Sequence, residues 1–184
     1  MDVILASSSP RRAKLLTQLF DDFKIIPPKI DESKYPVETL STEKCKKVAL
    51  MHKSSLVIAA DTFVLLDGEV IGKPENDEAA FKMLKLLSGK THQVITYYTF
   101  MMLSEHLLFT SSAISNVTFN DLSDETIKNY IAASMPLDKA GGYGLQENDE
   151  FHLIKEVDDS LTNVIGLPIE MLKIDLNRLG FKTK

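Results

Sequence analysis

The chain has 184 residues, of which 44% are hydrophobic and 26% are charged, and its formal net charge is −5. This is the composition of a globular protein, and the length suits one domain or a compact two-lobed one. The acidic balance argues against broad nucleic-acid binding, and no apolar run approaches the ~20 residues of a membrane span. We therefore expect residues 1–184 to form a single domain with no nucleic-acid and no membrane partner.

The cellular compartment is indicated by cysteine usage. Cys45 is the only cysteine, so the chain cannot form an internal disulfide. The first residues, MDVILASS, lack the basic leader and long apolar core of a signal peptide. Both features point to a reducing compartment, the cytoplasm. Since Cys45 lies in a helical pattern, we expect a packed or surface thiol rather than a nucleophile.

The first third of the chain predicts two strands and two helices. Val3–Ser7 is a short apolar run, which is typical of a buried strand. Ser9 is a good N-cap and Pro10 suits the first helical position, so a helix should begin there. The next expected elements are a strand, a polar loop and a helix, over residues 23–26, 31–39 and 41–52.

The rest of the chain alternates between strands and helices. Leu56–Leu66 is the clearest strand, and Asp67-Gly68 offers a hairpin turn after it. Asn76 can cap a helix that ends at Ser88-Gly89. A long pair of strands follows over residues 92–103 and 107–119, and then a helix over 123–134. The chain continues with a glycine-rich loop over 138–146, a strand over 151–157 and a last helix over 166–180. This order predicts an α/β fold with a mixed sheet.

The segment Ser88–Thr91, SGKT, is similar to the end of a phosphate-binding P-loop. That motif needs a glycine five residues before the GK glycine, and Leu84 stands there. It also needs a strand followed by a helix, whereas here a helix ends and a strand begins. We therefore reject a P-loop.

Asp61 is the polar residue that fits its surroundings least. It interrupts the apolar strand LVIAADTFVLL, where an unpartnered carboxylate would cost several kcal/mol. It could lie at a strand end and accept hydrogen bonds from backbone amides. Alternatively, it could be a functional carboxylate aimed at a metal or a water molecule.

Arg11 and Arg12 fall in the first turn of a predicted helix, where the dipole favours acids. A bound polyphosphate would explain them, so we expect both arginines to bind phosphate rather than to support the fold. Lys73, in GKP, Lys53, at a helix end, and Glu32, after a strand, could each be ordinary solvated side chains. Together with Asp61 they suit a site in which cations hold phosphates and carboxylates hold Mg²⁺ and orient water.

Six segments resemble the Maf family in sequence and in order. They are SSSPRRAKLL, AADTFV, GEVIGKP, SGKTHQVIT, DKAGGYGLQ and NVIGLP, and the resemblance runs from Val3 to about Leu167. It implies an α/β fold of the inosine-triphosphatase-like type, with two lobes, a long curved mixed sheet flanked by helices, and a cleft between the lobes. It also implies that the chain hydrolyses a nucleoside triphosphate between its α- and β-phosphates with a divalent metal, Mg²⁺ or Mn²⁺.

The resemblance assigns roles to individual residues. Asp61 matches the proton acceptor of the family, and Glu32 joins it as a candidate metal ligand. Arg11, Thr62 and Gln146 match positions associated with base preference and resemble the branch that acts on dTTP and UTP, rather than the 7-methyl-GTP branch. The candidate phosphate-binding residues are Ser8, Arg11, Arg12, Lys53 and Lys73. The chain departs from the family at Asn76, where an acid is common, although Asn76 should still cap its helix.

Two functions remain at this point. One is a dTTP/UTP pyrophosphatase with a house-cleaning role in the nucleotide pool. The other is a nucleotide-binding regulator of cell division (septum formation) with little turnover. Asp61 favours the enzyme, because a sensor needs no acceptor for a proton of water. The expected partners are the nucleotide substrate and a second copy of the chain, in a homodimer.

Overall fold

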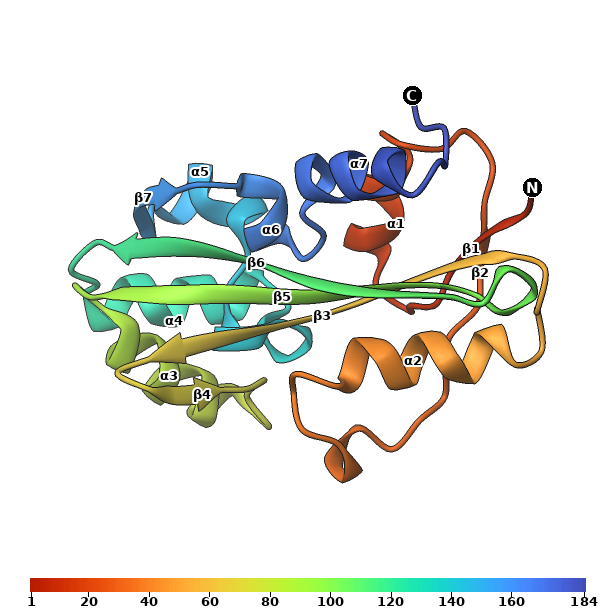
Figure 1. The fold of residues 1–184 in the computed structure, drawn as a ribbon. Coiled ribbons are helices and arrows are strands. Elements are labelled where there is room, and N and C mark those ends of the chain that lie inside the picture. Colours follow the sequence, from red (N-terminus) through yellow and green to blue (C-terminus); the bar gives the residue numbers. More distant parts are fainter. The chain divides into compact units, whose positions relative to one another are not determined.

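The computed structural model describes all residues, 1–184 (Figure 1). The strands are β1 (Val3–Leu5), β2 (Lys24–Ile25), β3 (Leu56–Leu66), β4 (Glu69–Ile71), β5 (Thr91–Met102), β6 (Leu107–Phe119) and β7 (Ile154–Asp158). The α-helices are α1 (Pro10–Leu16), α2 (Leu40–Ala49), α3 (Asp77–Leu87), α4 (Asp124–Ala133), α5 (Asn148–Phe151), α6 (Leu161–Ile165) and α7 (Ile169–Arg178). None of the helices is long and apolar enough to cross a membrane.

The strands form one mixed sheet, as the sequence predicts. Its order is β2-β1-β3-β5-β6-β7, and β4 pairs with β3 outside this path. β1 runs parallel to β2 and β3, whereas the β3–β4 and β6–β7 pairs are antiparallel. The α/β architecture with a mixed sheet is therefore confirmed.

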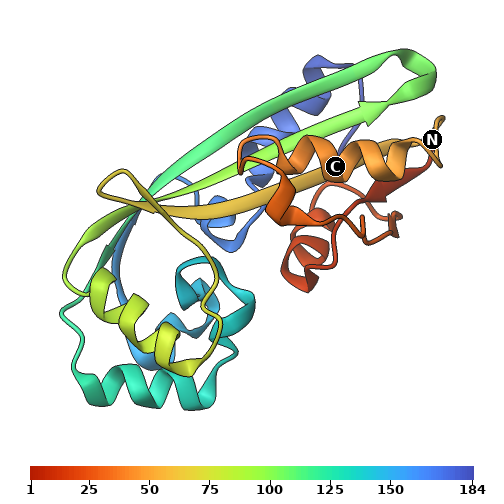
Figure 2. The same cartoon turned by 90° about the horizontal axis from the view of Figure 1, so that it is seen from below.

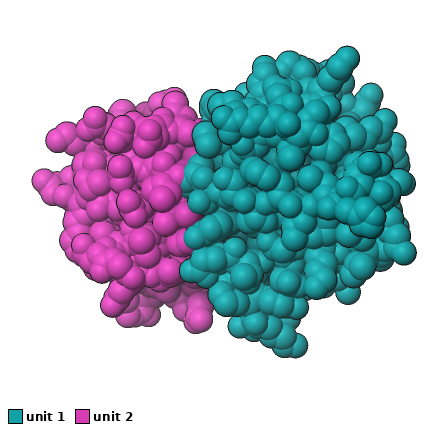
Figure 3. Space-filling view, in the orientation of Figure 1, with its two compact units in different colours: residues 1–61, 96–113, 166–184 teal, residues 62–95, 114–165 magenta.

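The chain divides into two compact units (Figure 3). Unit 1 comprises residues 1–61, 96–113 and 166–184, and unit 2 comprises residues 62–95 and 114–165. β3, β5 and β6 each contribute residues to both units. Along β3, the division falls between Asp61 and Thr62.

Unit 1 carries α1 and α7 on one face of its strands and α2 on the other (Figure 1). Seen from below, α2 lies in front of the strands and α7 lies behind them (Figure 2). α2 packs through Cys45 and Val48 against the sheet residues Ile4, Val57 and Met101. Cys45 is fully buried, and this burial raises the pKa of its thiol, so it is a packed thiol as expected.

Unit 2 is built around the pairing of α3 with α4. Asn76 caps α3 as predicted, since its Oδ1 accepts from the Ala79 amide at 2.8 Å. Leu84 and Leu87 of α3 and Tyr130 of α4 enter one apolar core with the end of β6. Tyr143 of the glycine-rich loop belongs to the same core, and Leu145 packs against it.

The element boundaries differ from the sequence-based expectation in two places. The strand predicted over 151–157 begins only at Ile154, because α5 occupies Asn148–Phe151 and His152 has a φ of +51°. The last predicted helix does not begin at Gly166, whose φ of +124° separates α6 from α7. Such a φ is open to glycine and interrupts a helix.

Candidate active site

The turn before α1 is organised by its serines. Ser7 Oγ accepts from the Ser9 amide at 3.1 Å, and Ser9 Oγ accepts from the Arg12 amide at 3.4 Å. Ser9 is thus the N-cap and Pro10 the first residue of α1, as predicted. Ser8, which is exposed, and the partly exposed Arg11 lie at this same turn.

Asp61 lies in the middle of β3 and keeps 15% of its side chain exposed. Its Oδ2 pairs with Lys44 Nζ, and the same ammonium lies 2.8 Å from Glu32 Oε1. Asp61 is therefore not a strand-end residue held by backbone amides. It belongs to a cluster in which two carboxylates share one ammonium group.

Lys44 is the member of this cluster that sequence reasoning missed. It lies in α2 with only 8% of its side chain exposed. A signal was present: Lys44 stands four residues after Leu40 and four before Val48, so the helical period places it on the buried face. A lysine on that face needs partners, and Asp61 and Glu32 supply them.

Arg12 extends the cluster, and it also supports the fold. Its Nε donates to the Gly166 carbonyl at 2.8 Å, so Arg12 makes a contact within the fold in addition to the phosphate-binding role expected of it. Burial lowers the pKa of Arg12, while the carboxylates of Asp61 and Glu32 oppose that shift. Arg12 therefore lies within electrostatic reach of both carboxylates, and its guanidinium stays charged at any physiological pH.

Lys53 lies elsewhere in unit 1. It precedes β3, and its carbonyl accepts from the Ser104 amide at 2.8 Å, at the tip of the β5–β6 hairpin. From Leu56, at the start of β3, to Asp61 the strand rises by about 16 Å. The structure thus does not bring Lys53 together with Asp61, and Lys44 is the lysine found there.

Three other predicted residues, Thr62, Lys73 and Gln146, belong to unit 2. Thr62 is partly buried in β3, whereas Lys73 and Gln146 are exposed on loops. The carbonyl of Gly72 accepts from the amide of Gly141 at 2.9 Å. This hydrogen bond fastens the loop of Lys73 to the glycine-rich loop that carries Gln146.

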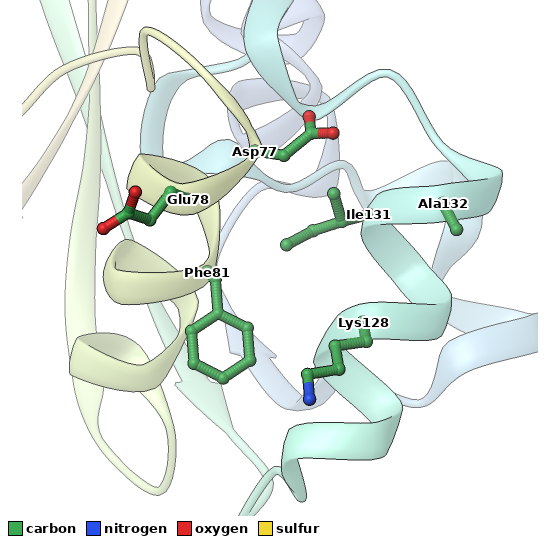
Figure 4. A pocket seen from close by; sticks show the side chains of 6 residues that line it. All are labelled: Asp77, Glu78, Phe81, Lys128, Ile131 and Ala132. Carbon is green, nitrogen blue, oxygen red and sulfur yellow. The ribbon is translucent and has the colours of Figure 1, made fainter.

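A shallow groove between α3 and α4 offers a different kind of site (Figure 4). Its volume is about 330 Å³, and its lining residues are Asp77, Glu78, Phe81, Lys128, Ile131 and Ala132. It contains none of the predicted site residues, and its two acids outnumber its one cation. Such a lining does not suit a polyphosphate, so the cluster around Lys44 remains the candidate site.

The donor set of this cluster fits a hard divalent cation. Asp61 and Glu32 offer carboxylate oxygens, which Mg²⁺ and Mn²⁺ prefer, and both converge on the position of one cationic group, Lys44 Nζ. No group of three or more His, Cys, Asp or Glu side chains is arranged to hold a metal. A magnesium ion at nucleotide sites commonly takes one or two carboxylates and completes its shell with phosphate and water.

Comparison with known proteins finds several relatives that share one name. A protein of Carboxydothermus hydrogenoformans named dTTP/UTP pyrophosphatase is 41% identical, over 98% of this chain and 100% of its own length. Proteins with the same name from Phocaeicola vulgatus and Thermosipho africanus are 44% and 45% identical, covering 96% and 92% of this chain and 95% and 88% of their own.

The fold and the family are also found by comparison. The structure of the Staphylococcus aureus Ham1 protein aligns with a TM-score of 0.51 at 19% identity, over 66% of this chain and 73% of that one, which is a likeness of fold. The family described as Maf-like protein matches residues 2–179. With nearly the whole length matched, the chain belongs to the Maf family.

Proposed function

We propose that this protein hydrolyses dTTP and UTP to the corresponding monophosphate and pyrophosphate, and so removes these nucleotides from the pool. Its relatives carry the name dTTP/UTP pyrophosphatase at 41–45% identity over nearly their full length. The observation that carries the proposal is the ammonium of Lys44 between the carboxylates of Asp61 and Glu32, with Arg12 beside them.

The charges of this cluster suit a polyanion. Lys44 contacts two carboxylates and Arg12 lies within their electrostatic reach, while Arg11 adds a third cation at the same turn as Arg12. Arginine forks bind phosphate oxygens in pairs, and a lysine ammonium binds them as a point charge. Within unit 1, we assign phosphate binding to these residues and Ser8. For Lys73, in unit 2, phosphate binding stays a proposal drawn from the family resemblance.

Asp61 is the proposed general base. Its carboxylate accepts a proton from water while the water oxygen bonds to phosphorus. The phosphorus attacked is that of the α-phosphate. Its bond to the oxygen that bridges the α- and β-phosphates breaks, and pyrophosphate leaves with the electron pair of this bond. Because Lys44 pairs with Asp61 Oδ2, it holds the carboxylate in place for this step.

Asp61 and Glu32 would also hold the divalent cation, Mg²⁺ or Mn²⁺. Such an ion neutralises phosphate charge and polarises the reacting phosphoryl group. Excess chelator should therefore abolish pyrophosphate release, and added Mg²⁺ should restore it. Unchanged release in chelator would exclude the metal from the reaction.

Base preference is assigned to Gln146, Thr62 and Arg11. A glutamine amide both donates and accepts, which suits the alternating oxygen, N–H and oxygen of the uracil or thymine edge. Cytosine presents a different edge, so CTP should be a poorer substrate. A site built on such hydrogen bonds rejects a mismatched base more strongly than an apolar pocket does.

The test is pyrophosphate release from dTTP, UTP, CTP, GTP and 7-methyl-GTP, compared as kcat/KM. We expect dTTP and UTP to lead, and a preference for either guanine nucleotide would contradict the assignment. Tight nucleotide binding with no pyrophosphate release would instead favour the regulator of cell division. A cytoplasmic location and a homodimer also remain proposals, the first supported by the lack of a second cysteine.

A further inference from the structure

Unit 2 contains a partly buried ion pair that the proposed chemistry does not use. Lys139, at the start of the glycine-rich loop, keeps only 7% of its side chain exposed. Its Nζ lies 3.0 Å from Glu147 Oε1 and donates to the Met135 carbonyl at 3.1 Å. Asp138 Oδ1 is a more distant third neighbour, at 3.7 Å. The pair thus joins the two ends of the segment 139–147.

This ion pair closes over Gly144. A Cβ built on Gly144 would overlap Glu147 Oε2 and come within 2.9 Å of Lys139 Cε. The φ of Gly144 is −131°, which any residue can adopt, so a Cβ at this position would displace the two side chains without straining the backbone. The Gly144 amide donates to Tyr130 Oη at 3.0 Å, which anchors the loop to α4.

Gln146 lies next to Glu147 of this ion pair in the sequence. It is exposed in the short 3₁₀ helix Leu145–Glu147, so the Glu147 side chain fixes the turn on which Gln146 stands. On the other side of that turn, Asn148 Oδ1 accepts from the Ile154 amide at 2.6 Å. The backbone around Gln146 is therefore held on both sides, while its own side chain remains accessible.

With Lys139 buried and Glu147 27% exposed, this ion pair adds little net stability to the fold. Desolvation offsets most of its attraction, and apolar residues of similar size often serve as well or better. Glu147 Oε2 is moreover buried without a hydrogen-bond partner, which adds to the cost. What such a pair can supply is one defined geometry, and here that geometry belongs to the loop of Gln146.

We infer that the Lys139–Glu147 ion pair, closed over Gly144, is a positioning device that sets Gln146 for selection of the base. This inference rests on the proposed function, in which Gln146 contacts the base. The two residues act through Gln146 and touch no substrate themselves. Loosening the pair should lower the ratio of kcat/KM for dTTP to kcat/KM for CTP. The kcat/KM for CTP, the poor substrate, should change less than this ratio.

The experiment compares the kcat/KM ratio of dTTP to CTP in purified variants. Glu147→Gln keeps the shape and removes the charge, and Gly144→Ala displaces the pair with a backbone that tolerates alanine. We expect both to lower the ratio about tenfold, to near that of Gln146→Ala. Adding Glu147→Gln to Gln146→Ala should change the ratio by less than about twofold, because both act on the same contact.

The matched control is Glu150→Gln, an exposed glutamate of α5, which should leave the ratio unchanged. A purely structural pair would lower the melting temperature and the active fraction while the dTTP/CTP ratio stayed at its wild-type value, and that result overturns the inference. If Gln146→Ala itself leaves the ratio intact, the base contact assigned to Gln146 fails, and the inference fails with it. If only the Gln146 variant loses selectivity, the base contact stands and the positioning role is rejected.

Discussion

Lys44 is the residue on which the charge balance of the candidate active site depends. In Lys44→Met, the carboxylates of Asp61 and Glu32 would face each other without the shared ammonium. Without Lys44, the carboxylate of Asp61 loses the group that holds it in place for proton transfer, and the triphosphate loses one cation. We expect kcat/KM to fall at least about tenfold.

Lys47→Met is the control for this change, because Lys47 is an exposed lysine of the same helix. It should retain wild-type activity. Lys53→Met tests the alternative assignment drawn from the resemblance. A larger loss in Lys53→Met than in Lys44→Met would show that the phosphate-binding lysine is Lys53 after all.

Asp61→Asn should separate binding from chemistry. The amide keeps the shape of the side chain but cannot accept the proton of water, so pyrophosphate release should fall by on the order of 10²–10⁴. Nucleotide binding, measured by calorimetry, should persist. Asp22→Asn, at an exposed aspartate of unit 1, is the matched control. Turnover within a few-fold of wild type in Asp61→Asn would remove Asp61 from the mechanism.

The sequence revealed some site residues and hid others for physical reasons. Asp61 was evident because a charge in the middle of an apolar strand is costly. Lys44 was missed because lysines in an amphipathic helix are usually solvated, and only its position on the face of Leu40 and Val48 marked it as buried. Glu32 is one of the carboxylates that compensate for the burial of the Lys44 ammonium. It lies in a turn twelve residues before Lys44, and no local sequence pattern links the two residues.

At the scale of elements, the side chain of Arg12 ties α1 to the segment that precedes α7. Arg12→Gln should therefore lose both phosphate binding and the hydrogen bond to the Gly166 carbonyl. We expect hydrolysis to drop at least about tenfold, and the free energy of unfolding in urea to drop by about 1–2 kcal/mol. Arg11→Gln should show a similar loss of hydrolysis with a smaller loss of stability.

Lys14→Gln, at an exposed position of the same helix, controls for the removal of a positive charge from α1. Equal unfolding midpoints for Arg11→Gln and Arg12→Gln would show that the bond to Gly166 contributes nothing measurable. Activity that survives in both variants would remove the arginines from the phosphate site.

Among the elements, those with strong local signals were predicted well. β3 has the predicted bounds, and α3 and α4 begin at the caps Asn76 and Ser123. α6 was not predicted, and the last helix was expected from Gly166 rather than from Ile169, because the positive φ of Gly166 is a conformation that glycine permits but does not require. α5 was missed because a helix of four residues has too few positions to show a period.

At the scale of the whole molecule, His92 should make stability depend on pH. It is buried in β5 with Nε2 2.6 Å from Tyr143 Oη, and burial lowers its pKa from 6.5 to about 4. Between pH 7 and 5 the unfolded chain takes up a proton that folded His92 does not, so stability falls as the pH falls. We expect a loss of about 2 kcal/mol from this residue over that range.

The measurement is urea unfolding at pH 7 and pH 5 for the wild type and for His92→Gln. The variant should lose less stability on acidification than the wild type. His106→Asn, which changes an exposed histidine, should behave like the wild type. If His92→Gln and the wild type respond equally to pH, folded His92 takes up a proton as easily as the unfolded chain does.

The arrangement of the sheet was beyond the reach of local patterns. The sequence predicted a mixed sheet, but the order β2-β1-β3-β5-β6-β7 depends on contacts between strands far apart in the chain. The two units likewise alternate along the sequence and share three strands. This sharing supports the proposal that residues 1–184 fold as one domain.

The division of unit 1 into three stretches has a consequence for synthesis of the protein. Its last stretch, residues 166–184, is made after all of unit 2. That stretch supplies the Gly166 carbonyl for Arg12, and the Lys184 amide that donates to the Leu19 carbonyl at 3.1 Å. On the ribosome, unit 2 thus has all its residues once Ile165 has been added, whereas α1 must wait for the stretch that follows. A nascent chain gains a fully supported Arg12 only after all of unit 2 has been synthesised.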